Sequence, residues 1–250
     1  MTIYGLIGYP LSHSFSRKYF LQKIKSEGLA HTDYLNFPLQ NIAEINRLIS
    51  GNPRIAGLNV TSPHKQTIIR YLDELSPEAQ KAGAVNLVKI IRQKDQKKSI
   101  GYNTDIFGFQ QSLTEHLPPN CKRTALIAGT GGAARAVSVA LNNLGFSYHF
   151  VSRKKKTNNT LIYNELSKEC LQDITLIVNA TPLGMYPRTE EKPNLPYDGL
   201  HPEHILFDLI YNPSESAFLQ EGKKRKCLII NGLKMLHYQA DKAWEIFLKK

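Results

Sequence analysis

The fold of this chain is indicated most clearly by Thr124-Ala-Leu-Ile-Ala128 and the segment that follows it, Gly129-Thr-Gly-Gly-Ala-Ala134. The first part is a short apolar run typical of a buried strand, and apolar residues continue at helical spacing from Ala134 to Leu144. The glycine segment between them matches GxGxxA at a strand-to-helix turn. Glycines allow a tight turn there, and the free N–H groups at the helix start attract a pyrophosphate. The segment therefore predicts a dinucleotide-binding fold, with an ordinary turn of small residues as the alternative.

The residues expected to face the phosphates are Gly129, Thr130, Gly131, Gly132, Ala133 and Ala134. About twenty residues further on, a fold specific for NAD would place an acidic residue against the ribose hydroxyls. This chain instead reads Ser152-Arg-Lys-Lys-Lys156. An arginine can direct two N–H groups at a 2′-phosphate and stack beside adenine, so the segment favours NADP over NAD. We expect Ser152, Arg153 and Lys154 to contact the cofactor, although the lysines could instead form a solvated loop.

The remaining sequence alternates strand-like and helix-like segments, which predicts an α/β fold. Strands are expected at 3–8, 34–38, 55–60, 85–91, 99–103, 124–128, 148–151, 174–179, 205–209 and 227–230. Helices are expected at 16–27, 41–50, 63–75, 107–116, 133–144 and 233–248. In the second half, this order predicts a parallel sheet, because parallel neighbours need crossover connections that helices usually supply. The domain boundary is expected between Gly101 and Phe107, with the final helix crossing back to the first domain.

Length and composition restrict the class of protein. The chain has 250 residues, 42% of them apolar, which suits one large or two modest globular domains. No apolar run approaches the roughly 18 residues that a membrane helix needs, so no membrane partner is expected. Three widely spaced cysteines indicate neither a disulfide framework nor a zinc site, and no metal is predicted. A reducing cytoplasm fits these features best.

The net charge of +11 permits nucleic acid, an anionic membrane or an anionic small molecule as a partner. A nucleic-acid binder would favour one basic stripe with interleaved aromatic residues. Here the lysines form several separate clusters, so no nucleic-acid partner is predicted.

Polar residues recur where the strands of the first hundred residues should end. Strand carboxyl ends are where open α/β sheets bind ligands. Neutral donors and acceptors around one ammonium and one carboxylate suit a small polyhydroxylated acid such as a sugar acid or cyclitol acid. Each Ser or Asn alone is more often a turn or cap residue, and only their joint placement predicts a site. The segments are Ser12-His-Ser14, Asn59–Lys65, Asn86 and Asn103-Thr-Asp105.

Eight segments in this order resemble the shikimate dehydrogenase family over nearly the whole chain. They are Gly5–Ser14 (GLIGYPLSHS), Asn59–Lys65 (NVTSPHK), Gly83–Asn86 (GAVN), Asn103–Asp105 (NTD), Gly129–Ala134 (GTGGAA), Asn179–Met185 (NATPLGM), Asp208–Pro213 (DLIYNP) and Gly232–Gln239 (GLKMLHYQ). Two positions depart from the family pattern: Thr130 stands where Ala is common, and Ser152-Arg-Lys154 where Asn-Arg-Thr is common.

The resemblance implies an enzyme that interconverts shikimate and 3-dehydroshikimate with NADP. It implies an N-terminal α/β substrate domain, residues 1–103 with 236–250, and a Rossmann-like, doubly wound parallel-sheet NADP domain, residues 104–235. Lys65 and Asp105 would form the catalytic pair. The substrate-binding residues implied are Ser12, Ser14, Asn59, Thr61, Asn86, Tyr211 and Gln239. Gly232 and Met235 would approach the nicotinamide, and Thr181 would also belong to the cofactor site.

Two other functions remain open at this point. One is a quinate/shikimate dehydrogenase that uses NAD, against which the basic segment after Val151 argues. The other is a dinucleotide-binding module without catalysis. We expect Lys65 to transfer the proton and Asp105 to orient the same hydroxyl, but the sequence leaves open which of the two carries the proton. It also leaves open whether the protein is a monomer or a homodimer.

Overall fold

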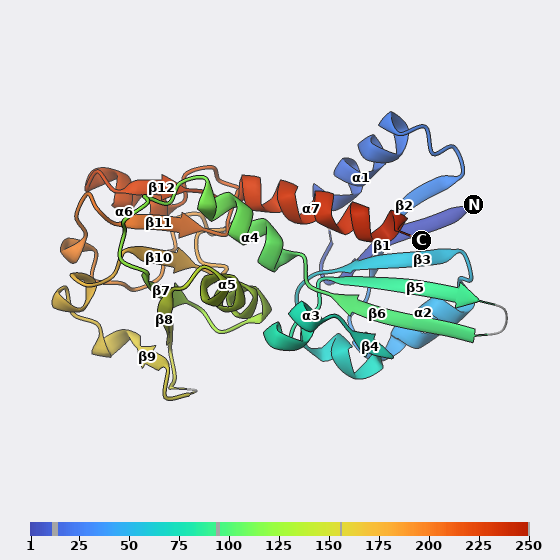
Figure 1. Cartoon of the computed structure of the whole chain (residues 1–250), viewed down its shortest axis with the longest axis horizontal. Coiled ribbons are helices and arrows are strands. Elements are labelled where there is room, and N and C mark those ends of the chain that lie inside the picture. Colours follow the sequence, from blue (N-terminus) through green and yellow to red (C-terminus); the bar gives the residue numbers. More distant parts are fainter. Residues whose placement is uncertain (12–14, 94–95, 156, 250) are drawn as a thin grey trace. The chain divides into compact units, whose positions relative to one another are not determined.

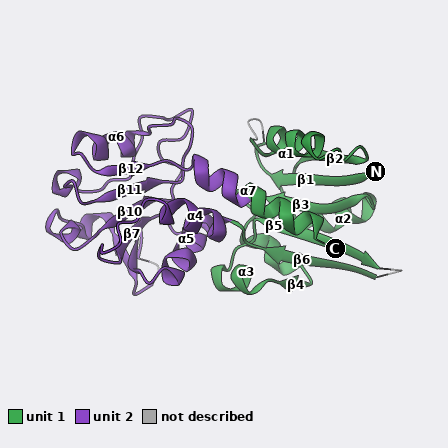
Figure 2. Cartoon of the chain, turned by 45° about the horizontal axis from the view of Figure 1, so that its top comes forward, with its two compact units in different colours: residues 1–104, 240–250 green, residues 105–239 purple. Residues whose placement is uncertain are grey.

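The computed structural model describes residues 1–11, 15–93, 96–155 and 157–249, and the chain forms two compact units (Figures 1 and 2). Unit 1 comprises Met1–Thr104 and Ala240–Lys250, and unit 2 comprises Asp105–Gln239. Helix α7 (Leu233–Leu248) starts in unit 2 and ends in unit 1, so the C-terminal helix returns to the first unit as predicted.

Unit 1 is built on a mixed six-stranded sheet with the order β2-β1-β3-β5-β6-β4. Its strands are β1 (Thr2–Gly8), β2 (Thr32–Pro38), β3 (Ile55–Val60), β4 (Glu74–Leu75), β5 (Leu87–Gln93) and β6 (Gln96–Tyr102). Strand β1 is parallel to β2 and β3, whereas β5 is antiparallel to both β3 and β6. The carboxyl ends of β1, β2, β3 and β6 and the start of β5 therefore lie at the same edge of the sheet.

Each face of this sheet carries an apolar core. Helix α2 (Ile45–Gly51) packs Ile45 and Ile49 into the cluster on one face. Helices α1 (Phe15–Ser26) and α7 cover the other face, where Phe20 stacks on Tyr34 with ring centroids 4.6 Å apart. The unit also contains α3 (Pro77–Ala82) and 3₁₀ helices at Ile42–Glu44 and Thr67–Tyr71. Both faces of the sheet are therefore covered by apolar side chains, and its polar groups lie at the edge.

The helix expected over 63–75 is wrong. Residues 62–66 form turns, Thr67–Tyr71 is a short 3₁₀ helix, and Glu74–Leu75 pair with β6 as β4. Three consecutive β-branched residues at 67–69 disfavour an α-helix. Tertiary contacts also favour the observed conformation, because Ile68 is fully buried in the apolar cluster that contains Ile45 and Ile49 of α2.

Unit 2 contains an entirely parallel six-stranded sheet with the order β12-β11-β10-β7-β8-β9. Its strands are β7 (Thr124–Ala128), β8 (Ser147–Ser152), β9 (Thr160–Ile162), β10 (Leu176–Asn179), β11 (Ile205–Asp208) and β12 (Leu228–Ile230). Counted from β7 as the first strand, this is the 3-2-1-4-5-6 order of dinucleotide-binding folds. The predicted doubly wound parallel sheet is confirmed, and the switch point lies between β7 and β10.

The central strands of unit 2, β7, β10 and β11, are buried on both faces, so they read as nearly continuous apolar runs. Helix α6 (Ala217–Lys224) packs Phe218 and Leu219 on one face. Helices α4 (Asp105–Thr114) and α5 (Gly132–Asn143) belong to the other, where Phe109 contacts Phe207 with ring centroids 4.7 Å apart. Short 3₁₀ helices at Tyr163–Glu165, Glu169–Leu171 and Tyr197–Gly199 replace α-helices in two of the crossovers. Across the described part of the chain, no helix has the length and apolar character needed to span a bilayer.

Candidate functional site

Polar residues at the ends of three strands lie at one edge of the unit 1 sheet. Asn59 on β3 lies opposite Leu87 on β5, and Leu87 lies opposite Tyr102 on β6. The amide N–H of Val60 donates to the Asn86 carbonyl at 2.8 Å, which continues the pairing to the sheet edge. The predicted residues Asn59 and Asn86 and the segment after Tyr102 are therefore brought together by strand pairing.

Asn86 is held by the segment that leads into unit 2. Its Oδ1 accepts from the backbone N–H of Thr104 at 2.7 Å, and its Nδ2 donates to Thr104 Oγ1 at 2.9 Å. Asn103 Nδ2 donates to the Ala84 carbonyl at 2.9 Å. All three polar side chains are buried. The hydrogen bonds of Asn86 and Asn103 fix the chain immediately before Asp105, which is the buried first residue of α4.

Asn59 is supported by a residue that sequence analysis missed. The fully buried Tyr34 hydroxyl donates to Asn59 Oδ1 at 2.8 Å. Burial raises the pKa of this phenol far above its ordinary value, while a hydrogen bond with Ser16 acts in the opposite direction. This hydrogen bond fixes the orientation of the Asn59 amide. An isolated aromatic residue in a strand reads as core, and its hydroxyl partner is invisible in sequence.

A tight turn after β3 carries Thr61 and Lys65. The Thr61 N–H donates to the Ile7 carbonyl at 2.9 Å, and the Thr61 carbonyl accepts from the His64 N–H at 3.0 Å. His64 is buried, and its Nε2 lies 2.7 Å from the Leu39 carbonyl oxygen. The backbone carbonyl of Lys65 accepts from Val85 N–H at 2.7 Å. The turn is thus fixed by its backbone and by His64, and it presents a half-buried Lys65.

The glycine turn of unit 2 has the geometry of a phosphate cradle. Gly129 follows β7 with φ of +110°, and a Cβ there would lie 2.9 Å from the Ala180 carbonyl oxygen. Gly131 is the N-cap of α5 with an ordinary φ of −77°, and a Cβ there would meet no described atom within 4 Å. The first turn of α5 contains no acidic residue. Open space before exposed helix N–H groups suits an anion.

The basic segment lies at the end of the neighbouring strand, β8. Ser152 is its buried last residue, and Ser152 Oγ accepts from the Lys154 N–H at 3.3 Å. The side chains of Arg153 and Lys154 are exposed. Because β8 is parallel to β7, both turns lie at the same edge of the unit 2 sheet.

The remaining predicted residues of unit 2 follow the last strands and start α7. Thr181 comes after β10, and its hydroxyl donates to Asn179 Oδ1 at 2.6 Å. The backbone of Gly232 packs closely against the loop that follows β11, since a Cβ on Gly232 would lie 2.2 Å from the Leu209 carbonyl oxygen. Tyr211 is half-buried, which raises the pKa of its phenol. Met235 is buried on α7, and Gln239 Nε2 donates to the Leu236 carbonyl one turn earlier at 2.9 Å. The predicted residues Ser12 and Ser14 lie outside the described residues.

Comparison with known proteins places this chain in a family. The model of the shikimate dehydrogenase substrate binding domain matches residues 6–88. A shikimate dehydrogenase (NADP(+)) of Methanococcus maripaludis is 39% identical over 98% of this chain and 91% of its own length. The chain belongs to the shikimate dehydrogenase family.

Solved structures of the family agree with this assignment. A shikimate 5-dehydrogenase of Thermus thermophilus, solved with NADP(H) and shikimate, is 29% identical with a TM-score of 0.85, covering 99% of this chain and 94% of that one. A quinate dehydrogenase of Corynebacterium glutamicum, solved with NAD, is 26% identical with a TM-score of 0.85, covering 99% and 93%. The shared architecture is an N-terminal substrate domain followed by a Rossmann-like nucleotide domain. The fold predicted from the sequence is therefore confirmed.

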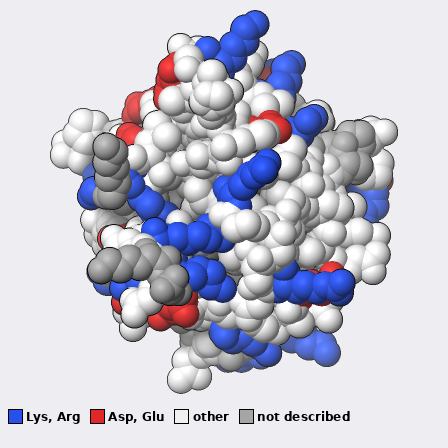
Figure 3. Space-filling view, turned by 90° about the vertical axis from the view of Figure 1, so that its right-hand side faces the viewer, with Lys and Arg blue, Asp and Glu red and all other residues white. Residues whose placement is uncertain are grey.

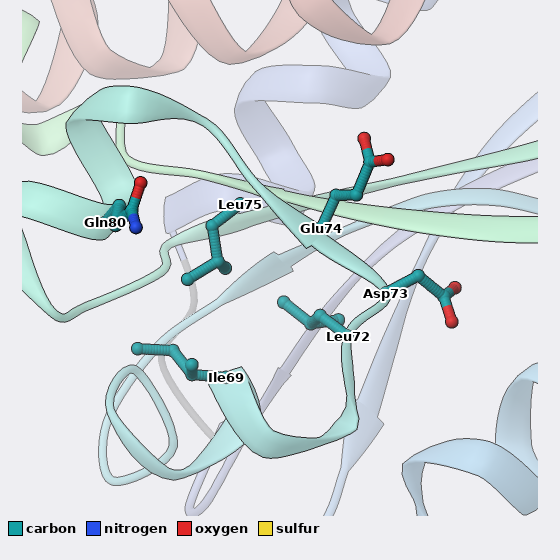
Figure 4. A pocket seen from close by; sticks show the side chains of 6 residues that line it. All are labelled: Ile69, Leu72, Asp73, Glu74, Leu75 and Gln80. Atoms are coloured by element: carbon teal, nitrogen blue, oxygen red, sulfur yellow. The ribbon is translucent and has the colours of Figure 1, made fainter.

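A shallow cavity of about 380 Å³ lies elsewhere on unit 1, and none of the predicted site residues lines it. In Figure 4 the carboxylates of Asp73 and Glu74 point away from its apolar side chains. Asp73 Oδ2 accepts from Ser99 N–H and Oγ at 2.7 Å, which lowers the pKa of this carboxyl, and Glu74 pairs with Lys98 at 2.6 Å. Both acids are engaged in holding β4 against β6. The lining residues are Ile69, Leu72, Asp73, Glu74, Leu75 and Gln80.

Proposed function

We propose that this member of the family is an NADP-dependent oxidoreductase that interconverts shikimate and 3-dehydroshikimate by hydride transfer. The observation that carries the proposal is the pairing of the cradle after β7 with Arg153 after β8, in a chain whose relatives across almost their full length are named shikimate dehydrogenase (NADP(+)). Unit 1 would bind the substrate and unit 2 the cofactor.

The residues of unit 2 fit NADP. The turn Gly129–Ala134 offers backbone N–H groups and open space to the pyrophosphate, with Thr130 as its first variable position. Arg153, with Ser152 and Lys154, would take the 2′-phosphate, because a guanidinium binds phosphate through two parallel hydrogen bonds. Thr181, Gly232 and Met235 would border the nicotinamide, which supplies the hydride acceptor when bound.

The residues of unit 1 suit a hydroxylated ring acid. Thr61, with the amides of Asn59 and Asn86, would bind ring hydroxyls, each of which needs a donor and an acceptor. We assign the substrate carboxylate to Ser12 and Ser14, assisted by Tyr211, and a further hydroxyl to Gln239. The assignments of Asn59, Thr61 and Asn86 follow the family resemblance and their position at one edge of the unit 1 sheet. Those of Ser12, Ser14, Tyr211 and Gln239 follow the family resemblance alone.

Alcohol oxidation needs one group to accept the hydroxyl proton. We assign this proton to Lys65 Nζ, because the turn after β3 holds Lys65 through its backbone at the polar edge. Asp105 would orient the same hydroxyl. Asp105 is the first residue of α4, and the anchored Asn103-Thr104 segment leads directly into it.

A quinate/shikimate dehydrogenase that uses NAD is the second candidate, because the quinate dehydrogenase of Corynebacterium glutamicum shares this fold. The basic Ser152–Lys154 segment favours NADP. An absorbance assay at 340 nm with shikimate or quinate, each with NADP or NAD, separates the two. We expect turnover with shikimate and NADP to exceed the other three combinations. Activity only with quinate and NAD would contradict both specificity assignments.

The role of Lys65 is tested by Lys65→Ala. Losing a proton-transfer group lowers turnover by roughly 10²- to 10⁴-fold, and we expect a smaller change in KM for shikimate. Lys81→Ala, an exposed lysine on α3 of the same unit, is the matched control and should retain wild-type kinetics. Near-normal turnover of Lys65→Ala would remove Lys65 from the mechanism.

We propose no nucleic-acid partner. On the face shown in Figure 3, Lys and Arg side chains stand at several separate places with Asp and Glu among them, which is typical of a solvated surface. The three cysteines, Cys121, Cys170 and Cys227, are free thiols, which fits a reducing compartment such as the cytoplasm.

A further inference from the structure

Two buried polar side chains end neighbouring strands of unit 2, and neither has a role in the proposed reaction. Asn179 is the last residue of β10 and Asp208 the last residue of β11. The two are direct partners in the parallel register, and both are fully buried. Asn179 Nδ2 donates to Asp208 Oδ1 at 3.0 Å. This hydrogen bond joins the two strand ends beside the fold's switch point.

Asn179 extends this link into the loop after β10. Its Oδ1 accepts from both the N–H of Thr181, at 3.1 Å, and the Thr181 hydroxyl, at 2.6 Å. Its Nδ2 also donates to the Leu183 carbonyl at 3.2 Å. The Asn179 side chain therefore fixes where Thr181 lies.

Asp208 extends the link into the loop after β11. Its Oδ1 also accepts from the Ile210 N–H at 3.0 Å, and its Oδ2 accepts from the buried Ser216 hydroxyl. The Ile210 carbonyl in turn accepts from the Gly232 N–H at 3.0 Å. Ser216 is also the N-cap of α6, where its Oγ accepts from Leu219 N–H at 3.4 Å. The Asp208 carboxylate is thus hydrogen-bonded directly to Asn179, to Ile210 in the β11 loop and to Ser216 at the start of α6. Asn179 links it to the β10 loop, and Ile210 links it to the turn before α7.

We infer that Asp208 is a positioning residue for the nicotinamide half of the cofactor site: through Asn179 and Ile210 it sets the places of Thr181 and Gly232. The inference rests on the proposed function, which puts those two residues beside the nicotinamide. The glycine turn and Arg153, which would hold the adenine half, receive no hydrogen bond from this network among the described residues.

A carboxylate is costly to bury, and this one is retained with three donors on two oxygens. An aspartate accepts at both oxygens, whereas an asparagine accepts at only one. Asp208→Asn can therefore keep the bonds from Asn179 and Ile210 and lose only the acceptor for Ser216. Asp208→Ala loses all three. The two variants form a graded series.

The test compares binding of NADP with binding of adenosine 2′,5′-bisphosphate, which lacks the nicotinamide, by calorimetry on the full chain. For Asp208→Ala we expect the Kd for NADP to rise roughly tenfold to a hundredfold, the range for lost hydrogen bonds to a charged group, with partial recovery in Asp208→Asn. The Kd for the bisphosphate should stay within about twofold of wild type. Asp173→Asn, an exposed aspartate of the same unit paired with Lys122, is the control.

Two results would overturn the inference: unchanged NADP binding in Asp208→Ala, or an equal loss for both ligands. If Asp208→Ala does not fold, Ser216→Ala, which removes a single donor, must show the same selective loss for NADP on a smaller scale. A wild-type protein that bound neither ligand would instead refute the proposed function, and the inference with it.

Discussion

Replacing Gly131 by Ala separates the cofactor role of the glycine turn from its structural role. The added Cβ would meet no described atom within 4 Å, and φ of −77° suits any residue. Ala restricts the unfolded chain, which stabilises by about 0.4–1 kcal/mol, but it is a poorer N-cap than Gly by a similar amount. The two effects oppose each other, so the free energy of unfolding should change by less than about 0.5 kcal/mol.

The same methyl group would project into the space where we place the pyrophosphate. Close approach of the backbone to the phosphates is the reason for glycine there. We expect the Kd for NADPH, measured by fluorescence titration, to rise about tenfold or more, which corresponds to about 1.4 kcal/mol. The free energy of unfolding is measured on the same samples by urea titration.

Substitutions at two other glycines serve as controls for Gly131→Ala. Gly51→Ala, at the end of α2, also meets no described atom within 4 Å and should change neither quantity much. Gly232→Ala would place its Cβ 2.2 Å from the Leu209 carbonyl oxygen and should lower stability strongly. If Gly131→Ala bound NADPH as wild type does, the phosphates would not lie against this turn. If Gly131→Ala lost as much stability as Gly232→Ala, the space beside Gly131 would not be open in the folded protein.

Two further predictions concern buried polar groups. Tyr34→Phe leaves Asn59 Oδ1 without its donor, which should destabilise the fold by about 1–3 kcal/mol and raise KM for shikimate, as measured by urea unfolding and initial rates; an unchanged KM would mean that Asn59 needs no support from Tyr34. Burial raises the pKa of the Asp208 carboxyl from 3.8 to about 6, so the native state holds this proton more tightly than the unfolded chain does. The contribution of Asp208 to stability is thus full below pH 4 and is lost as the pH rises through 6, by about 3 kcal/mol at 1.36 kcal/mol per unit. The free energy of unfolding of wild type minus that of Asp208→Asn should fall by most of this amount, about 2.4 kcal/mol, between pH 4 and pH 7, and a constant difference would contradict the assignment.

Much of the fold was predictable because its information is local. The run Thr124–Ala128 and the spacing of apolar residues from Ala134 predicted β7 and α5, and the range 233–248 predicted α7 with the bounds observed. Composition and periodicity report burial one segment at a time, and such segments are long and regular here. Short elements were missed, among them α3, β9 and α6, because few residues carry the pattern. The range 63–75 failed because β4 exists only through its pairing with β6.

The candidate site, like the fold, could be predicted from the sequence only in part. Residue types and their order predicted the glycine turn, the basic segment and the polar residues at strand ends. Strand order and register brought Asn59 and Asn86 to one edge, since β5 runs antiparallel to β3, and no sequence pattern states that. The supporting roles of Tyr34 and Asp208 could not be predicted for the same reason.

The residues that could bind a phosphate, a hydroxyl or a proton can be named from the sequence alone, because that chemistry resides in each side chain and its immediate neighbours. Which of these groups share a hydrogen bond depends on the folded chain, because partners such as Tyr34 and Asn59, or Asn179 and Asp208, lie 25 and 29 residues apart and meet only when the strands pair.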